Sequence, residues 1–296
     1  MEIQVSIIIV NYNCEEHTCN CIDSIYKHVT NLNFEIIVVD NASSTVNILL
    51  ERYPEIKLIV NKENLGFGSA NNIGVRQASG NYIFFLNPDT ILLNDAVSLF
   101  YEFLKNKSND VACCGGNLVN ADGSPNISYG NFPSVLQQFS DIGFRIFYKR
   151  FYSENLSLGQ YCYFRNIKKV SYLSGSAFFI KKQLFESIGG FDEHFFMYYE
   201  ETDLFLRLEK AGYKSYILPD VKIIHLESVT TKCELPFNYG KWAMMEKSKY
   251  YYFTKNRNSF TSLCVRLFQI ISLFVIYFHN PKKFNLKKAI IITFTA

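Results

Sequence analysis

The sequence predicts an α/β fold, a doubly wound and mostly parallel sheet followed by a C-terminal helical extension. The first observation is that short β-branched or aromatic runs alternate with helical patterns through the first half of the chain, as in folds that build a parallel sheet. The second is that this alternation resumes after a polar and aromatic segment at 120–169. With 296 residues, the chain can form one large domain with appendages or two small domains.

The predicted elements follow in order along the chain. Strands of the first half are short apolar runs at 6–10, 34–39, 57–60 and 82–86. Helical patterns separate or follow them at 15–28, 70–78 and 94–105. The segment 120–169 is expected to form a long ordered excursion over the ligand-binding edge of the sheet. Later elements are strands at 172–180, 214–218 and 221–225, helices at 181–187 and 200–211, and two helices from Phe237 onward.

The composition is that of a globular protein, because 48% of the residues are hydrophobic and 20 Tyr and 27 Phe give unusual aromatic weight. The eight cysteines form no CxxC pair and no Cys/His ligand spacing, so we expect reduced thiols packed as small apolar side chains, which favours the cytosol. The first apolar run, Val5 to Val10, is too short for a secretory signal, and we expect it to form the first strand.

Charge is distributed unevenly, although the net charge is only +3. From Lys241 onward, ten Lys and Arg residues accompany the single acidic residue Glu246, so this part carries +9 and the first 240 residues carry −6. The basic residues flank Ser259–Phe278, whose only charged side chain is Arg266. This pairing favours contact with an anionic membrane surface over contact with nucleic acid.

In a helix over Ser259–Phe278, four polar residues share one face, namely Ser262, Arg266, Gln269 and Ser272. An interfacial helix that lies in the membrane plane fits this pattern best. A core or oligomer-contact helix and a membrane-spanning helix are the alternatives, the last disfavoured because Arg266 would lie inside the bilayer.

Polar side chains follow the predicted strand 82–86 directly. Asn87 and Asp89 flank Pro88, which ends the strand and holds a rigid turn with both side-chain oxygens free. Ligands bind at the carboxyl ends of the strands in an open α/β sheet, so two hard oxygens here suit a divalent cation that bridges phosphates. An ordinary Asn-Pro-Asp turn is the alternative.

The first two predicted strands also end in polar residues, Asn11 and the pair Asp40 and Asn41. Asp40 can accept hydrogen bonds from a nucleobase or ribose hydroxyls, or it can cap a helix that starts at Ser43. The segment 64–74 opens a helix with small residues, whose backbone amides could approach a diphosphate. It is not a dinucleotide fingerprint, because that pattern needs glycine at Asn71.

A cluster of carboxylates begins a predicted helix in the second half of the chain. Glu200, Glu201 and Asp203 stand within four positions, after the aromatic residues Phe195 and Phe196. Carboxylates favour the first turn of a helix, so an ordinary acidic helix start is one interpretation. The other is that aromatic shielding raises the pKa of one carboxyl group enough for it to act as general base on a hydroxyl.

Seven segments together resemble glycosyltransferase family 2, most closely the rhamnosyltransferase-like branch of bacterial polysaccharide biosynthesis enzymes. They occur in the order and approximate spacing of that family: VSIIIVNYN, VVDNASS, NLGFGSANNIG, FFLNPDT, SGSAFFIKK, GGFDEHFFMYYEETDLFLRLEKAGY and IIHLES. The resemblance covers about 3–228 and implies a GT-A fold over 1–236, with a nucleotide-sugar-binding half at 1–119 and an acceptor and catalytic half at 120–236. The basic, apolar tail at 237–296 lies outside it.

The function that the resemblance implies is an inverting, metal-dependent glycosyltransferase. It would use Mg²⁺ or Mn²⁺ and move a hexosyl group, with rhamnose as the leading choice, from a nucleotide-diphosphate sugar to a glycan or lipid-linked glycan acceptor. The expected setting is cell-surface polysaccharide synthesis on the cytoplasmic face of the inner membrane. Peripheral membrane contact and a homodimer are the other expected partners, and nucleic acid is not.

Two alternatives remain open. A sugar-1-phosphate nucleotidylyltransferase-like enzyme needs a Gly-rich, basic phosphate loop after the first strand, where this chain has Asn11-Tyr12-Asn13-Cys14. A catalytically inactive membrane-surface scaffold with the same fold would gain nothing from Glu201 or Asp89.

The resemblance also assigns residues to the two substrates. The implied donor-binding residues are Asn11, Asp40, Asn41, Asn64, Gly66, Asn72, Asn87 and Asp89. The implied acceptor-side residues are Gly175, Asp192, Glu193 and Glu200. Donor selectivity is expected to depend on contacts within 120–169 and around Ser174–Ser176.

For the chemistry, the resemblance implies that Glu201 is the catalytic base. Asp203 is the rival, because glutamate stands at 201 where the family usually has aspartate. Asp89 and His225 are the implied metal ligands. Asn87 departs from the usual Asp-x-Asp pair and leaves the first position with one neutral oxygen.

Overall fold

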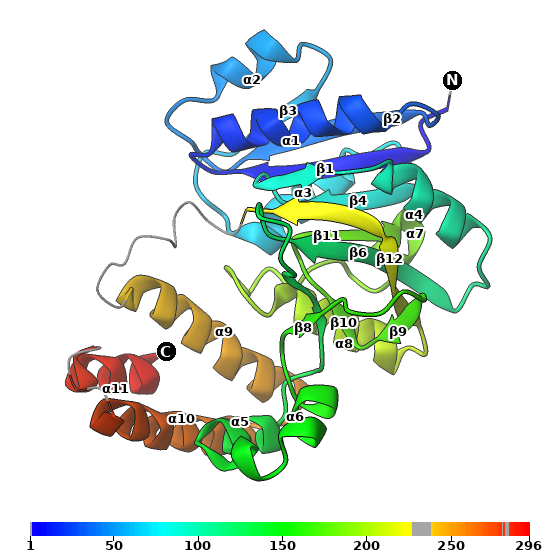
Figure 1. The fold of residues 1–296 in the computed structure, drawn as a ribbon. Helices are drawn as coiled ribbons and strands as arrows, with labels where there is room; N and C mark the ends of the chain where they lie inside the picture. Colours follow the sequence, from blue (N-terminus) through cyan, green and yellow to red (C-terminus); the bar gives the residue numbers. More distant parts are fainter. Residues whose placement is uncertain (1, 227–237, 280, 282–283) are drawn as a thin grey trace.

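A nine-stranded mixed sheet forms the centre of the computed structural model, which describes residues 2–226, 238–279, 281 and 284–296 (Figure 1). Its strands are β1 (Val5–Asn11), β2 (Phe34–Asp40), β3 (Lys57–Val60), β4 (Tyr82–Leu86), β5 (Thr90–Leu92), β6 (Val111–Val119), β9 (Lys168–Val170), β11 (Ala177–Lys181) and β12 (Lys214–His225). The strand order is β3-β2-β1-β4-β11-β6-β12-β5, and β9 pairs with β12. A second, three-stranded sheet consists of β7 (Ile127–Gly130), β8 (Gln160–Tyr161) and β10 (Tyr172–Leu173).

The predicted α/β class and parallel sheet are confirmed. Strands β3, β2, β1 and β4 pair in parallel, as do β6 and β12, whereas β11 runs antiparallel between β4 and β6. The predicted strand 172–180 is in fact two strands, because β10 joins the small sheet while β11 joins the large one. The two strands predicted between 214 and 225 form one strand with a shift in register, and β5, β6 and β9 were not predicted.

Helices cover both faces of the large sheet. The helices of the described chain are α1 (Glu15–His28), α2 (Asn47–Arg52), α3 (Phe67–Arg76), α4 (Ala96–Lys105), α5 (Val135–Asp141), α6 (Lys149–Asn155), α7 (Lys182–Ser187), α8 (Glu200–Lys210), α9 (Tyr239–Asn256), α10 (Ser259–His279) and α11 (Leu286–Thr295), with a 3₁₀ helix η1 at Phe144–Phe147. Of these, α5, α6, α10 and α11 lie away from the large sheet (Figure 1). The described tail thus holds three helices instead of the predicted two. The third begins where the Asn285 side chain accepts a hydrogen bond from the backbone nitrogen of Lys288, which caps α11.

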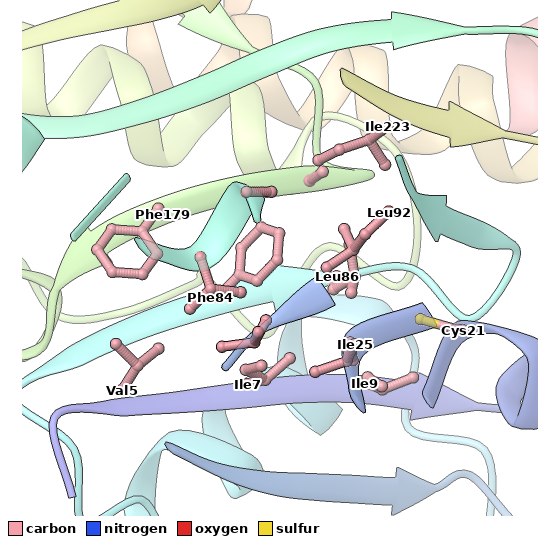
Figure 2. Close-up of a cluster of buried hydrophobic side chains, with 14 of the residues drawn as sticks. Val5, Ile7, Ile9, Cys21, Ile25, Phe84, Leu86, Leu92, Phe179 and Ile223 are labelled. Atoms are coloured by element: carbon pink, nitrogen blue, oxygen red, sulfur yellow. The ribbon is translucent and has the colours of Figure 1, made fainter. Parts of the chain in front are cut away.

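Alternating side chains of the strands build a separate hydrophobic core on each face of the sheet. Figure 2 shows one of them, where Val5, Ile7 and Ile9 of β1 lie beneath side chains of β4 and β11 and next to Ile25 of α1. The intervening residue Ile8 points to the opposite core, which α3 and α8 cover. Burial on both faces fixes the register of the parallel strands, so their carboxyl ends align at one edge of the sheet.

Phe85 of β4 is the centre of an aromatic cluster in the second core. Its ring centroid lies 4.8 Å from that of Phe178, 5.0 Å from that of Phe185 and 5.2 Å from that of Phe191. Phe85 is fully buried, so these rings tie β4 to β11, α7 and the loop before α8. The same strand leads directly into Asn87.

We therefore expect Phe85→Ala to lower the free energy of unfolding by about 3–5 kcal/mol, because it removes a buried ring and leaves a cavity. Urea denaturation followed by circular dichroism measures the change. The matched control is Leu99→Ala on α4, where the side chain is 42% exposed, and we expect a change within about 0.5 kcal/mol there. Equal loss in the two variants would contradict the assigned core.

Candidate active site

The sheet topology brings three separate segments to one edge. The backbone nitrogen of Asn87, just after β4, donates a hydrogen bond to the carbonyl oxygen of Ser176 at 2.8 Å. This contact forms because β11 runs antiparallel and starts at the edge where β4 ends. The backbone nitrogen of Leu226 donates to the carbonyl oxygen of Asp89 at 2.9 Å, so the end of β12 lies beside the same turn.

A cavity of about 410 Å³ opens at this edge. Its lining residues come from α3, α8, α9, the end of β12 and the loops after β4, before β11 and before α8, namely Phe67, Asn87, Asp89, Ser174, Gly175, Ser176, Met197, Tyr198, Glu200, Glu201, His225 and Lys241. Six of these are residues that the sequence analysis predicts for the site: Asn87, Asp89, Gly175, Glu200, Glu201 and His225. The lining thus combines carboxylate, amide, hydroxyl, imidazole and ammonium groups with the aromatic rings of Phe67 and Tyr198.

Asp89 and His225 form the metal-binding candidate of this cavity. The His225 Nε2 atom lies 3.5 Å from the Asp89 Oδ1 atom, and the side chains are 12% and 23% exposed, respectively. The Asn87 Oδ1 atom is buried beside them and has no hydrogen-bond partner among the described residues. No group of three or more His, Cys, Asp or Glu side chains that could hold a metal ion occurs in the part of the chain that the structure describes.

This donor set fits a metal ion that is shared with a substrate. Mg²⁺ and similar hard cations are usually bound through one or two carboxylates together with the phosphates of the substrate, not by a complete protein cage. The carboxylate of Asp89, the imidazole of His225 and the unsatisfied amide oxygen of Asn87 are compatible with such a shared site.

Two carboxyl groups reach the cavity from the first turn of α8. Tyr198 and Tyr199 precede this turn and both have a φ of 70°, a left-handed conformation that is unfavourable for tyrosine. The Glu200 side chain is buried and its Oε2 atom has no hydrogen-bond partner among the described residues. Burial, and then the charge of Glu201, raise the pKa of Glu200 well above its ordinary value.

Glu201 lies nearer to the solvent, and burial raises its pKa as well. Its side chain packs over Gly175, where an added Cβ would lie 3.4 Å from the Glu201 Cγ atom. Burial raises the pKa of both neighbouring carboxyl groups, so the pair carries one negative charge more readily than two. One carboxylate of this turn is therefore available as a proton acceptor.

The rival carboxylate, Asp203, does not line the cavity. It is fully buried and accepts hydrogen bonds from Arg207 Nε at 2.8 Å, Lys255 Nζ at 2.8 Å and Asn256 Nδ2 at 2.9 Å. These partners occupy both of its oxygens and connect α8 to α9. The geometry gives Asp203 a structural position and leaves Glu201 as the candidate base.

Asp192 and Glu193 also lie outside the cavity. Asp192 accepts hydrogen bonds from Lys255 Nζ at 2.7 Å and from the Tyr251 hydroxyl at 2.9 Å. Burial would raise the pKa of Asp192, but the hydrogen bond from Lys255 and others lower it below its ordinary value. Glu193 is exposed and accepts a hydrogen bond from Asn72 Nδ2 at 3.1 Å.

Asn72, a predicted donor-binding residue, does not line the cavity and makes hydrogen bonds to a loop instead. Its Nδ2 atom donates to the carbonyl oxygen of Phe191 at 2.9 Å, and its Oδ1 atom accepts from the backbone nitrogen of Phe191 at 3.0 Å. Both hydrogen bonds join α3 to the loop that leads to α8. Asn72 therefore holds the loop in place, away from the cavity lining.

The residues at the ends of β1 and β2 form a network of their own. Asn11 Nδ2 donates to Asp40 Oδ1 at 2.7 Å, and the backbone nitrogen of Ser43 donates to Asp40 Oδ2 at 2.9 Å. Asn41 Nδ2 donates to the carbonyl oxygen of Gly66 at 3.1 Å. These contacts occupy both carboxylate oxygens of Asp40, but Asp40 does not cap a helix, because α2 begins at Asn47 and has no side-chain cap.

Gly66 lies where two backbone segments meet. Its φ is 84°, and an added Cβ would overlap the carbonyl oxygen of Phe196, so only glycine fits. The Asn64 Oδ1 atom accepts a hydrogen bond from the Gly66 nitrogen at 3.0 Å. The predicted residues Asn11, Asp40, Asn41, Asn64 and Gly66 thus lie together beside the cavity, without being part of its lining.

Lys241 is a lining residue that the sequence analysis missed. It belongs to the first turn of α9, and its Nζ atom lies 5.9 Å from the centre of the Tyr198 ring. No local motif marks it, since it stands in a generally basic tail. Its cation lies in the same cavity as the carboxylates of Asp89 and Glu201.

The chain matches one protein family by sequence. The family model described as Glycosyl transferase family 2 matches residues 6–189. The N-acetylglucosaminyl-diphospho-decaprenol L-rhamnosyltransferase of Mycobacterium tuberculosis is 26% identical over 212 residues, which cover 66% of this chain and 67% of the relative. The rhamnosyltransferase WbbL of Escherichia coli K12 is 29% identical over 241 residues, which cover 75% of this chain and 83% of the relative.

The fold has a solved counterpart as well. The crystal structure of GalNAc-T7 with UDP, GalNAc and Mn²⁺ superimposes with a TM-score of 0.60 at 15% identity, over 95% of this chain and 58% of that one. This likeness concerns the fold alone, and it confirms the predicted GT-A type. Since the family model covers well over half of the chain and includes β1 to β11, the chain belongs to glycosyl transferase family 2 and is a glycosyltransferase that uses nucleotide sugars.

Proposed function

We propose that this protein is an inverting, metal-dependent glycosyltransferase that moves a hexosyl group from a nucleotide-diphosphate sugar to a glycan or lipid-linked glycan. The observation that carries the proposal is that one cavity joins the Asp89–His225 pair to the carboxylate of Glu201. One side of such a cavity can hold a diphosphate, and the other can accept a proton from an attacking hydroxyl. The cavity volume of about 410 Å³ is in the range of small-molecule sites.

On the donor side, Asp89 and His225 would hold Mg²⁺ or Mn²⁺, with the amide oxygen of Asn87 beside them. When bound, the ion supplies positive charge that stabilises the diphosphate leaving group. The chemistry of the donor set supports this assignment, and so does the Mn²⁺ in the GalNAc-T7 structure. The buried network around Asp40 and Gly66 would shape the adjoining nucleoside region.

On the acceptor side, Glu201 would act as the general base. It takes the proton of the acceptor hydroxyl as the oxygen attacks the anomeric carbon from the face opposite the diphosphate, and this single displacement inverts that carbon. The raised pKa of Glu200 disfavours a second negative charge beside the base. The residues 1–119 would then serve mainly the donor, and 120–236 mainly the acceptor.

Lys241 would pair with the diphosphate. Departure of the sugar leaves growing negative charge on the phosphate oxygens, and an ammonium group in the same cavity stabilises it. The position of Lys241 in the cavity lining supports this role.

The transferred sugar is proposed to be rhamnose, because both sequence relatives named above are rhamnosyltransferases. The name of the mycobacterial relative includes a polyprenyl diphosphate acceptor, which supports a lipid-linked glycan here. A lipid-linked acceptor and a nucleotide-sugar donor meet at the cytoplasmic face of a membrane, and we propose cell-surface polysaccharide synthesis at that location.

Glu201→Gln should lower the transfer rate by about 10²–10⁴, the usual contribution of a general base, while donor binding is retained. Because the pKa of Glu201 is raised, the wild-type rate should fall as the pH drops through a value above that of an ordinary glutamate. Steady-state transfer assays and donor titration by calorimetry measure both.

The matched control is Glu209→Gln on the exposed side of the same helix, which should transfer at the wild-type rate. Asp203→Asn should instead destabilise the fold, since it weakens a buried charge network. If Asp203→Asn folds, binds donor and loses turnover more than Glu201→Gln does, the base is Asp203.

Asp89→Ala should lower transfer at least about 100-fold and remove the gain in donor affinity that Mn²⁺ gives the wild-type protein. Calorimetry of donor binding with and without Mn²⁺ isolates this gain from turnover. Asp220→Ala, an exposed change on the same strand as His225, is the control. An unchanged Mn²⁺ effect in Asp89→Ala would exclude the metal-ligand role.

Lys241→Gln should lower kcat/KM for the donor by about 10–100-fold, the effect of losing one hydrogen bond to a charged group. Lys247→Gln removes an exposed cation from the same helix and should have little effect on soluble-substrate assays. Product inhibition by the nucleoside diphosphate gives a second readout, which should weaken in Lys241→Gln alone. Equal inhibition of the two variants would place Lys241 outside the diphosphate site.

A further inference from the structure

The helix α10 exposes a continuous apolar face along its length. The side chains on this face recur at steps of three and four, and they are Phe260, Leu263, Leu267, Ile271, Phe274 and Phe278, each 41–79% exposed. We call this set the outer face of α10. By length and composition α10 could cross a membrane, and only 17% of its apolar window is buried. A contiguous apolar surface of this kind marks an interaction site.

Three polar side chains along the middle of α10, those of Ser262, Arg266 and Gln269, point into the protein. Ser262 donates a hydrogen bond to the carbonyl oxygen of Tyr250 at 3.1 Å, and Gln269 accepts one from Lys249 Nζ at 2.8 Å. The guanidinium group of Arg266 lies 4.0 Å from the centre of the Tyr250 ring. A surface helix of a protein in water normally has the opposite orientation.

Arg266 also anchors the end of the described chain. Its guanidinium group donates to the carbonyl oxygens of Thr293, Phe294 and Ala296 in the last turn of α11. The helix α10 therefore packs on α9, α11 and α5. A membrane-spanning position would break these contacts and leave the buried Lys249 and Glu246 pair without Gln269, so an in-plane position fits the structure better.

A second exposed apolar group lies next to α10. The segment from η1 to α6 carries four exposed apolar side chains, namely Phe144, Ile146, Phe147 and Phe151. Phe139 of α5 links the two regions, because its ring centroid lies 4.4 Å from that of Phe144 and 5.7 Å from that of Phe268 on α10. In Figure 1, α10, α5 and α6 occupy the lower edge of the molecule, at the end opposite α2.

Cations accompany this edge. Arg145 and Lys149 are exposed beside the aromatic residues of η1 and α6, and Lys287 and Lys288 are exposed on α11. Among anionic partners, a bilayer supplies both the apolar interior for the aromatic side chains and the negative head groups for the cations. A symmetric pairing of two copies through this face would bring the like charges of the two copies together.

We propose that the outer face of α10, together with the exposed aromatic residues of η1 and α6, docks in the plane of an anionic lipid surface. The helix lies flat over a length of about 30 Å, with its apolar side among the acyl chains and the cations at the head groups. This inference goes beyond the proposed transfer reaction and does not depend on which sugar is moved.

Co-sedimentation of the full chain with vesicles of phosphatidylglycerol and phosphatidylcholine tests the proposal, with pure phosphatidylcholine vesicles for comparison. The wild-type protein should bind the anionic vesicles more tightly, and added salt should weaken that binding. Leu267→Glu with Phe274→Glu should reduce the partition coefficient about 100-fold or more, because two apolar side chains no longer enter the membrane.

The matched control is Ile48→Glu with Leu50→Glu on α2, where the side chains are similarly exposed, at 51% and 44%. This control should bind like the wild type. Lys149→Gln with Lys287→Gln should weaken binding to anionic vesicles by about fivefold for each cation removed, and leave binding to neutral vesicles unchanged.

Donor hydrolysis in vesicle-free buffer should be the same in the wild type and the outer-face variant, which separates this test from that of the catalytic proposal. Equal sedimentation of the wild type and the outer-face variant would overturn the proposal. So would a wild-type dimer in size-exclusion chromatography that the outer-face variant converts to a monomer while neither binds vesicles, because the partner would then be a second copy.

Discussion

The proposed site depends on a fixed position of the first turn of α8, and a network of buried charged side chains fixes that turn. Asp203 binds Arg207 within the helix and Lys255 from α9, while Arg207 also donates to the carbonyl oxygens of Ile188 and Gly190, at 2.6 Å each. One network thus joins α8, α9 and the loop before α8. Removing one partner from such a buried network leaves an uncompensated charge, so its members are interdependent. The positions of both cavity carboxylates, Glu200 and Glu201, follow from it.

The same network connects α9 to α8, so that α9 lies between the cavity and α10. Its first turn carries Lys241 into the cavity, its last turn carries Lys255 to α8, and its opposite side packs on α10. Tyr250 and Phe253 of this helix share a hydrophobic cluster with Phe195, which lies in the loop before α8. The segment that the sequence sets apart as a basic tail is therefore packed against the proposed catalytic region, and what contacts α10 from outside lies two helices away from the cavity.

How much of this could be predicted depends on how local the signal is. Asn87 and Asp89 were found because polar residues at strand ends meet at one edge in any sheet of this class, whereas His225 was found only through the resemblance to the family. The hydrogen bonds of Asp203 were not predicted. An acidic first turn has the same sequence whether its carboxylates face a cavity or bind a lysine such as Lys255, 52 residues away. Strand β6 was not predicted, because Val111–Val119 contains two Cys, two Gly and an Asn. This segment is recognisable as a strand only through its pairing with β11 and β12.

The left-handed backbone at Tyr198 and Tyr199 has a consequence for how the protein can change. Each such residue holds about 1–3 kcal/mol of conformational strain, which the surrounding packing must offset. Glycine, which has no Cβ atom, would relieve the strain and also release the turn that presents Glu201. A substitution that stabilises the fold at this dipeptide therefore disturbs the catalytic geometry. Selection for thermal tolerance alone would favour substitutions of Tyr198 and Tyr199 that lower turnover.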